Sequence, residues 1–223
     1  METVDLPKFI TFDCYDTLVE FPIEETTRRM LGDRLAGVPE DEFFQEYDEL
    51  RFQAILAPYR PYHEVLRQTL AEAMRRYGLS YRDEDGETLV AAVPTWGPYP
   101  DVPPALDRLR QQCKLAIISN SDDAIIAGNV RRIGVPFAHV ITAEQARAYK
   151  PSPVIFDYAL RVLGCESDEL LHVAQGFEYD IVPGHKLGWN RVWINRYGKV
   201  GDPAYGPYQE LPDLSGLPEL LGL

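Results

Sequence analysis

The sequence predicts an α/β fold in which a parallel sheet, with helices on both faces, carries an inserted all-helical cap. Apolar strands alternate with helical segments from about residue 97 onward, and one isolated strand precedes a long, purely helical stretch. Since a βαβ pattern produces a parallel sheet, the isolated strand belongs to that sheet and the helical stretch interrupts it. We therefore expect a core of residues 1–17 and 97–223, and a cap of residues 18–96.

The first strand is predicted over residues 9–12, whose aromatic and β-branched side chains are typical of a buried strand. Residues 23–93 look helical throughout, with no alternating pattern between them. Apolar residues such as Leu66 and Leu70 recur at helical spacing and predict a helix over about residues 62–77.

A turn-rich segment, residues 94–100, ends the helical stretch. Beyond it, strands are expected over residues 115–118, 139–141, 170–174 and 192–194. Helices are expected between them, over residues 122–133, 153–163 and 181–187. Residues 197–216 are rich in Gly, Pro and Tyr, and we expect a surface loop there.

Composition restricts the partners and the compartment. The formal net charge is −13, and an acidic surface repels phosphate backbones, so we expect no nucleic acid partner. No run of roughly 18 apolar residues is present, so we expect no membrane span, and residues 1–13 lack the pattern of a secretory signal. Cys14, Cys113 and Cys165 form no CxxC pair, which favours a reducing, cytoplasmic location over disulfides or zinc.

Four groups of polar residues follow the predicted strands. They are Asp13-Cys14-Tyr15-Asp16-Thr17, Ser119-Asn120, Lys150-Pro151 and Gln175 to Asp180. Each group alone is explained as readily by a turn, a helix cap or a solvated lysine. Because successive strands of a parallel sheet end at one edge, the four groups together predict a single site there.

These ordered groups resemble the haloacid dehalogenase superfamily, whose four motifs match Asp13-x-x-x-Thr17, Ser119-Asn120, Lys150-Pro151 and Asp180. The resemblance covers essentially the whole chain and implies a Rossmann-like core with the cap inserted. It also implies that Asp13 is the nucleophile and that Thr17 and Ser119 orient it and the substrate. By the same resemblance, Lys150 balances the charge of Asp13, and Asp180 lies beside Lys150.

The residue two positions after the nucleophile separates the branches of this superfamily. Phosphatases carry an Asp there, which protonates the leaving alkoxide, whereas this chain has Tyr15. Gln175 also replaces an Asp that supports magnesium in phosphatases. The chain is more similar to the L-2-haloacid dehalogenases, which have a D-x-Y-G-T pattern and work without metal, although Asp16 replaces their Gly. A halide leaves without a proton, so that reaction needs no acid at position 15.

The resemblance implies hydrolysis of an (S)-2-haloacid to a 2-hydroxy acid and halide through an aspartyl ester, with no metal and no cofactor. A small 2-haloacid is the expected partner, and a homodimer is compatible with the resemblance. The residues expected to bind substrate are Tyr15, Asn120, Phe156, Gln175, Phe177 and Arg51.

Several positions depart from the dehalogenase pattern. No Trp-Arg pair occurs on the cap, where Phe43-Phe44 stands instead, and Arg51 and Arg60 are the nearest cations. Phe156 replaces a Tyr, and Gln175 and Phe177 replace a Ser and an Asn. Three alternatives therefore stay open: a hydrolase of a non-halogenated small acid such as azetidine-2-carboxylate, a magnesium-dependent phosphatase, and a binding protein without catalysis. His172 and His185 are candidates for acid–base work, although the position of His172 within a strand favours a structural role.

Overall fold

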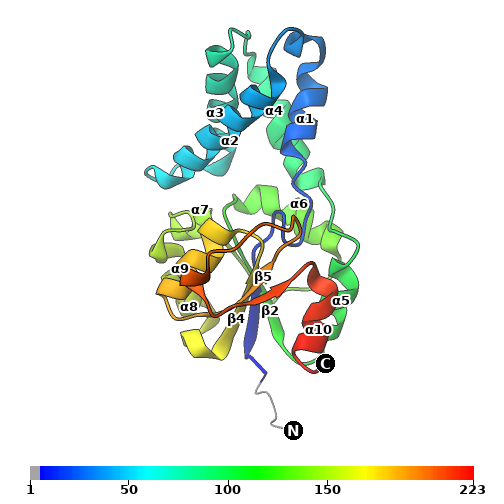
Figure 1. Cartoon of the computed structure of the whole chain (residues 1–223), viewed down its shortest axis with the longest axis vertical. Helices are drawn as coiled ribbons and strands as arrows, with labels where there is room; N and C mark the ends of the chain where they lie inside the picture. The colour runs from blue at the N-terminus through cyan, green and yellow to red at the C-terminus, as the bar shows by residue number, and fades with distance from the viewer. Residues whose placement is uncertain (1–5) are drawn as a thin grey trace.

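The structure is a computed structural model that describes residues 6–223. Its centre is a six-stranded, all-parallel sheet with the order β3-β2-β1-β4-β5-β6 (Figure 1). The strands are β1 (Phe9–Phe12), β2 (Lys114–Ser119), β3 (His139–Thr142), β4 (Leu170–Ala174), β5 (Asn190–Ile194) and β6 (Gln209–Leu211). The expectation of no secretory signal rests partly on residues 1–5, which lie outside the described residues.

The first strand occupies the middle of the sheet. Phe9 is in register with Lys114 of β2 on one side and with Leu170 of β4 on the other. All four residues of β1 are buried, which explains why its sequence is continuously apolar apart from Thr11. The strand order reverses between β1 and β4, and such a switch point opens a crevice at the carboxyl ends of the strands.

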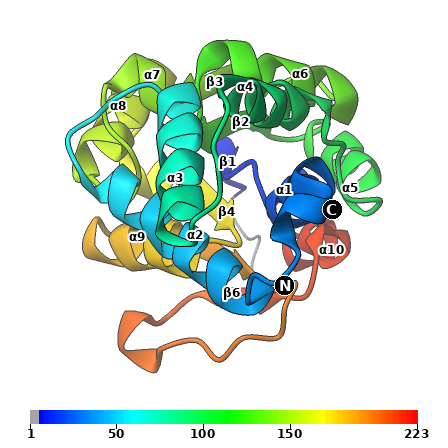
Figure 2. The ribbon, with the colours of Figure 1, turned by 90° about the horizontal axis from the view of Figure 1, so that it is seen from above.

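Helices cover both faces of the sheet, as the sequence predicts. Figures 1 and 2 show α5 (Val102–Leu109) and α10 (Leu217–Leu220) on one face, and α8 (Pro153–Leu163) and α9 (Val182–Lys186) on the other. The remaining core helices are α6 (Asp123–Ile133) and α7 (Ala143–Ala146).

Four helices stand over the carboxyl ends of the strands (Figures 1 and 2). They are α1 (Ile23–Leu31), α2 (Glu40–Leu56), α3 (Tyr62–Arg76) and α4 (Asp83–Ala92). We call this layer the cap. Helix α3 buries Leu66, Leu70 and Met74 of the apolar face that the sequence predicts, and Val65 beside them. The cap thus has an apolar interior of its own.

The two connections between cap and core run side by side. Val19, on the way into the cap, forms an antiparallel bridge with Pro98, on the way out. The backbone N–H of Tyr99 donates a hydrogen bond of 3.0 Å to Leu18 O. Arg196, after β5, donates to Thr17 O and stacks on the Tyr99 ring, 3.8 Å from its centroid. These contacts fix the base of the cap on the core.

Two expectations need correction. Residues 197–216 are not wholly loop, because β6 adds the sixth strand there, and the sequence reading left out α5. All three cysteines are free and buried. Within residues 6–223, no helix is long and apolar enough to cross a membrane.

Candidate active site

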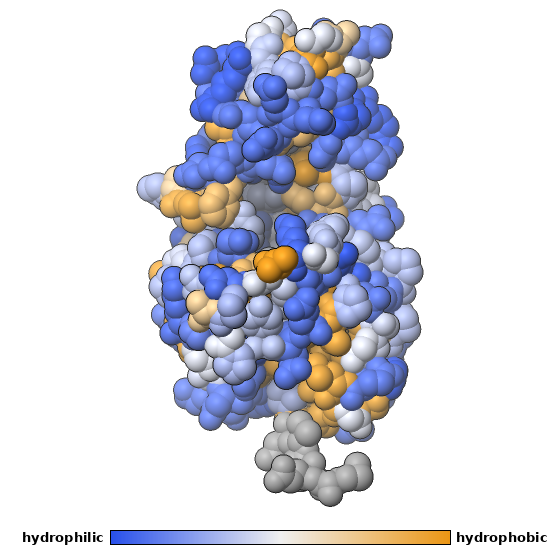
Figure 3. All heavy atoms as spheres, in the orientation of Figure 1, coloured by the Kyte–Doolittle hydropathy of each residue, from blue (hydrophilic) through white to orange (hydrophobic). Residues whose placement is uncertain are grey.

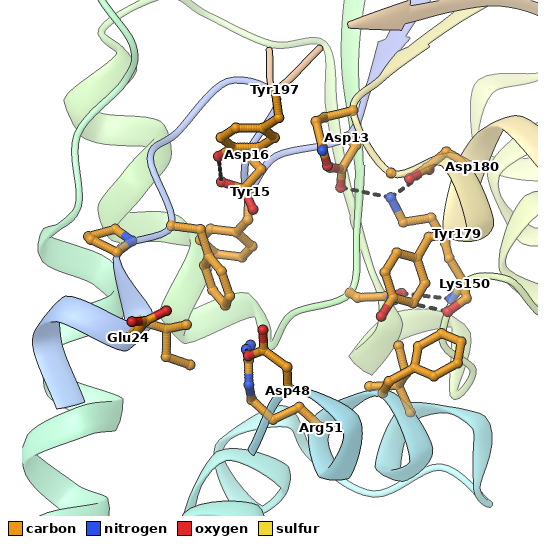
Figure 4. Close-up of a pocket in the computed structure, with 18 of the residues that line it drawn as sticks. Asp13, Tyr15, Asp16, Glu24, Asp48, Arg51, Lys150, Tyr179, Asp180 and Tyr197 are labelled. Atoms are coloured by element: carbon orange, nitrogen blue, oxygen red, sulfur yellow. Dashed lines mark hydrogen bonds and ion pairs between the residues drawn. The ribbon is translucent and has the colours of Figure 1, made fainter. Parts of the chain in front are cut away.

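A cavity of about 770 Å³ lies between the sheet's carboxyl edge and the cap. Figure 3 shows the surface hollowed between these two layers, and Figure 4 shows the side chains that face the hollow. It is lined by Asp13, Tyr15, Asp16, Phe21, Pro22, Ile23, Glu24, Glu25, Arg28, Asp48, Arg51, Phe52, Ile55, Tyr62, Asn120, Lys150, Gln175, Gly176, Tyr179, Asp180, Tyr197 and Lys199.

Asp13 follows the central strand directly, and its backbone N–H donates to Val173 O at 3.1 Å. Its two carboxylate oxygens have different partners. Lys150 Nζ donates to Oδ1 at 2.7 Å, and Thr17 Oγ1 donates to Oδ2 at 2.9 Å. The Thr17 hydroxyl in turn accepts a 2.9 Å hydrogen bond from the backbone N–H of Gln175. The carboxylate is therefore fixed in orientation at the cavity floor, as a nucleophile requires.

Lys150 joins two carboxylates. Its ammonium lies 2.7 Å from Asp13 Oδ1 and 2.7 Å from Asp180 Oδ1, as Figure 4 shows. Asn120 fixes the Lys150 backbone, because its amide oxygen accepts from the Lys150 N–H at 2.6 Å and its amide nitrogen donates to Lys150 O at 3.0 Å. Asn120 therefore positions the lysine as well as lining the cavity.

Asp180 lies in a single π-helical turn, Phe177–Ile181, between β4 and α9. Its Oδ1 also accepts a hydrogen bond from His172 Nε2 at 2.8 Å. Its other oxygen, Oδ2, is buried and accepts no hydrogen bond from residues 6–223. A β-carbon at position 176 would lie 2.7 Å from this oxygen, so Gly176 is what permits the close approach. Asp180 thus keeps one buried oxygen that has no hydrogen-bond donor in the described chain.

The two carboxyl groups differ in acidity. Burial raises the pKa of Asp13 above its ordinary value, and the charge of Asp180 adds to this, outweighing the lowering by Lys150. Burial also raises the pKa of Asp180, but the Lys150 ammonium and the His172 hydrogen bond outweigh it and hold the pKa low. For Lys150, the two carboxylates outweigh burial and raise the pKa. The site therefore keeps Asp180 ionised more firmly than Asp13.

Tyr15 contributes its ring rather than its hydroxyl to the cavity. The hydroxyl donates to Asn129 Oδ1 at 3.0 Å and lies 3.3 Å from Ser121 Oγ. The ring packs against Phe21, with 5.3 Å between centroids. Burial raises the pKa of Tyr15 well above its ordinary value, so the phenol is a poor proton donor.

Arg51 reaches the cavity from helix α2 of the cap (Figure 4). It is paired with Asp48, and its guanidinium lies 5.0 Å from the Tyr47 ring centroid and 5.5 Å from that of Phe21. Its Nε is buried and makes no hydrogen bond within residues 6–223. Helix α2 of the cap therefore positions the Arg51 cation across the cavity from Asp13. Arg60 instead bonds to Gln68 on the surface.

Three expected site residues lie apart from the cavity. Ser119 is fully buried at the end of β2, and its hydroxyl has no hydrogen-bond partner in the described chain. Phe156 is fully buried in α8 against Trp189, at 5.1 Å between centroids, so its expected contact with substrate is corrected to a core contact. Phe177 packs on Trp193 at 5.0 Å, beside rather than in the cavity. Gln175 does line the cavity.

The structure adds residues that the sequence reading did not assign to the site. Asp16, Asp48, Tyr179 and Tyr197 line the cavity. Asp16 has a positive φ of 60°, which no sequence pattern indicated. His172, an acid–base candidate in the sequence, lies directly behind Asp180 on the strand that leads to it.

The acidic residues are not arranged as a metal centre. No three His, Cys, Asp or Glu side chains are grouped to hold a metal ion anywhere in residues 6–223. Oδ1 of Asp13 and Oδ1 of Asp180 both accept hydrogen bonds from the Lys150 ammonium, and Gln175 offers only a neutral amide.

Comparisons with known proteins agree on a family. The model of the haloacid dehalogenase-like hydrolases matches residues 7–188. Haloacetate dehalogenase H-2 of Moraxella sp. (strain B) is 30% identical over 160 residues, which cover 70% of each chain. The glyceraldehyde 3-phosphate phosphatase of Methanopyrus kandleri is 28% identical over 223 residues, covering 92% of this chain and 91% of its own.

A solved structure of the L-2-haloacid dehalogenase from Xanthobacter autotrophicus, with chloropropionic acid covalently bound, has the same fold. It gives a TM-score of 0.81 at 21% identity and covers 97% of this chain and 99% of that chain.

Proposed function

Because the chain belongs to the haloacid dehalogenase-like hydrolases, we propose that it converts an (S)-2-haloacid to a 2-hydroxy acid and halide through an ester on Asp13. One observation carries the proposal. The Asp13 carboxylate faces the cavity between Lys150 and Thr17, while position 15 holds a tyrosine whose hydroxyl is bonded to Asn129. The site thus supports a nucleophile without an acid at position 15, which suits a halide leaving group.

In the first step, a carboxylate oxygen of Asp13 attacks C2 of the substrate in line with the carbon–halogen bond. A carbon–oxygen bond forms, and the halide departs with the electron pair of the broken bond, so C2 is inverted. Lys150 and Thr17 hold the carboxylate in one orientation for this attack. The step transfers no proton.

In the second step, water attacks the carbonyl carbon of the Asp13 ester. Asp180 accepts the water proton at its free Oδ2, which has no other hydrogen-bond donor within residues 6–223. The ester bond then breaks, the departing alkoxide takes up that proton as the 2-hydroxy acid forms, and the Asp13 carboxyl loses its own proton to solvent. Net, one water is consumed and one halide and one proton are released.

Arg51 and Asn120 are the groups we assign to the substrate's carboxylate and halogen. Arg51 is a cap cation with a free, buried Nε, and Asn120 lines the opposite wall. Tyr15 and Phe21 present rings that exclude water from the reacting carbon.

The test measures halide release from L-2-chloropropionate, chloroacetate and fluoroacetate with EDTA present. We expect release from the wild type and a loss of more than about 10⁴-fold in Asp13→Asn, the scale seen when a nucleophile is removed. Asp107→Asn, an exposed carboxylate on α5, is the matched control. In a single turnover in ¹⁸O-labelled water, the product oxygen should come from Asp13 and stay unlabelled.

Two results would overturn the proposal. One is wild-type halide release by folded Asp13→Asn. The other is magnesium-dependent phosphate release from small phosphoesters without any halide release, an activity in keeping with the name of the Methanopyrus kandleri relative.

A further inference from the structure

Asp16 places a further carboxylate on the cavity wall, apart from the Asp13–Lys150–Asp180 group. Its Oδ1 accepts hydrogen bonds from Tyr197 at 2.8 Å and from Tyr99 at 3.3 Å. No hydrogen bond from residues 6–223 reaches its Oδ2. Figure 4 shows Asp16 beside Tyr15 and Tyr197, across the cavity from Lys150.

The fold holds Asp16 in an unfavourable conformation. Its φ of 60° lies in the left-handed region, which costs most residues other than glycine about 1–2 kcal/mol and costs Asp less. The Asp16 N–H donates to Val19 O at 2.8 Å, and the two tyrosine hydroxyls hold the carboxylate. A strained residue fixed from both sides in a cavity wall is a common feature of ligand sites.

Asp16 forms no ion pair within residues 6–223, although the Arg51 guanidinium acts on it from across the cavity. The other carboxylates of the cavity either have a cationic partner or, like Glu25, lie exposed to water. The ion pairs are Asp13 and Asp180 with Lys150, Asp48 with Arg51, and Glu24 with Arg28. Asp16 receives only neutral hydroxyl hydrogen bonds. Burial raises the pKa of Asp16, and the hydrogen bonds from Tyr197 and Tyr99 and the charge of Arg51 only partly offset this.

The surroundings of Asp16 suit an organic cation. The rings of Tyr15 and Tyr197 lie beside Asp16 in the cavity wall (Figure 4), and aromatic faces attract cations: Lys199 lies 5.9 Å from the Tyr197 ring centroid. The cavity volume of about 770 Å³ falls within the range of roughly 300–1,000 Å³ that accommodates drug-sized ligands. The cavity as a whole therefore has room for a substrate longer than a three-carbon acid.

We propose that Asp16 is a specificity-determining residue that binds a protonated amino group on the substrate's side chain while C2 faces Asp13. The inference rests on the proposed function and names its substrate class as 2-haloacids that carry a distal ammonium group. The ammonium supplies the direct ion pair that Asp16 does not make within the described chain, and Oδ2 accepts its hydrogen bond.

The experiment compares 5-amino-2-chloropentanoate with 2-chlorohexanoate, in which a methyl group replaces the ammonium. We expect the wild type to prefer the ammonium substrate by about tenfold or more in kcat/KM of halide release. Asp16→Asn should bring that ratio close to one. Asn keeps an acceptor for both tyrosines and tolerates a positive φ, so only the charge is lost. Asp107→Asn should keep the wild-type ratio.

Calorimetry with the unreactive pair 5-aminopentanoate and hexanoate reads the cation preference without turnover. If halide is released from both chlorinated acids at equal efficiency, or if Asp16→Asn keeps the wild-type ratio, the inference is overturned and the dehalogenase function stands. If neither chlorinated acid nor any simpler 2-haloacid releases halide, the proposed function fails. The binding measurement then tests the inference by itself. A preference for 5-aminopentanoate that Asp16→Asn removes supports cation binding by Asp16, and equal binding of 5-aminopentanoate and hexanoate overturns it.

Discussion

His172 Nε2 lies 2.8 Å from Asp180 Oδ1, the oxygen that also accepts from the Lys150 ammonium. On its far side, His172 Nδ1 lies 2.8 Å from the hydroxyl of Thr11 in the central strand. A continuous line of polar contacts thus runs from the interior of the sheet through His172, Asp180 and Lys150 to Asp13. Every member except Asp13 is almost fully buried, so each contact restrains the next.

Replacing His172 with Phe should remove a hydrogen bond that fixes the orientation of the Asp180 carboxylate. The buried Oδ1 loses a donor, so the free energy of unfolding should fall by about 1–3 kcal/mol, and kcat for halide release should fall with it. Denaturant unfolding and steady-state kinetics measure both. The control is His139→Phe, because the His139 side chain makes no hydrogen bond within the described chain. An unchanged kcat in folded His172→Phe would show that Asp180 does not depend on His172.

The pH dependence of kcat/KM should report Asp13. The attacking carboxylate must be ionised, and its pKa is raised, so activity should fall in acid at a pH above the ordinary Asp value of about 3.9. Lys150→Gln removes the cation that lowers this pKa, so the acid limb should move to higher pH. The same change leaves two carboxylates unpaired and should cost about 3–5 kcal/mol of stability. If kcat/KM falls in acid at the same pH in Lys150→Gln as in the wild type, this assignment is wrong.

Tyr15→Phe separates the ring of Tyr15 from its hydroxyl. Since the hydroxyl is bonded to Asn129 and not to the reacting groups, kcat should stay within about twofold of wild type. The lost hydrogen bond should lower the free energy of unfolding by about 0.5–1.5 kcal/mol. A large fall in kcat with little loss of stability would instead make the phenol a participant in the reaction.

The cap contains a pH-sensitive ion pair. Arg34 binds both carboxylate oxygens of Asp85, at 2.7 and 2.8 Å, and this lowers the pKa of Asp85. A carboxyl whose pKa is lowered by folding stabilises the protein above the unfolded pKa, and this contribution is lost as pH falls through the folded pKa. Asp85→Asn should therefore lower the melting temperature at neutral pH, and its difference from wild type should shrink in acid. Thermal unfolding across that pH range measures it, and a constant difference would contradict the linkage.

Much of the fold could be predicted because its central strands are buried on both sides. Strand β4 was predicted with its observed bounds, since both faces of a central parallel strand are apolar. Strand β6 could not be, because it is three residues long, partly exposed and begins with Gln209. Only pairing with Val192 of β5 makes this segment a strand. Helix α5 begins with Val102 and two prolines, which resemble a turn although the first helical turn accepts proline.

For the site, the order of the motifs along the strands was enough to bring Asp13, Lys150 and Asp180 together. The order of the motifs does not determine which way the other side chains point. Phe156 faces the core because the phase of α8 is set by its packing on Trp189. Asp16 reaches the cavity because its backbone adopts a positive φ, a local choice that depends on contacts from distant segments such as Tyr197.

The bridge between Val19 and Pro98 brings the two ends of the cap to neighbouring points on the core. When the two ends of an inserted segment lie close together, the core needs only a short break in its chain to accommodate it, whatever the length of the segment. The cap is in this sense a cassette. Its helices can be lengthened, exchanged or lost in evolution while the sheet edge that holds Asp13 stays unchanged, so substrate choice and reaction chemistry can diversify independently.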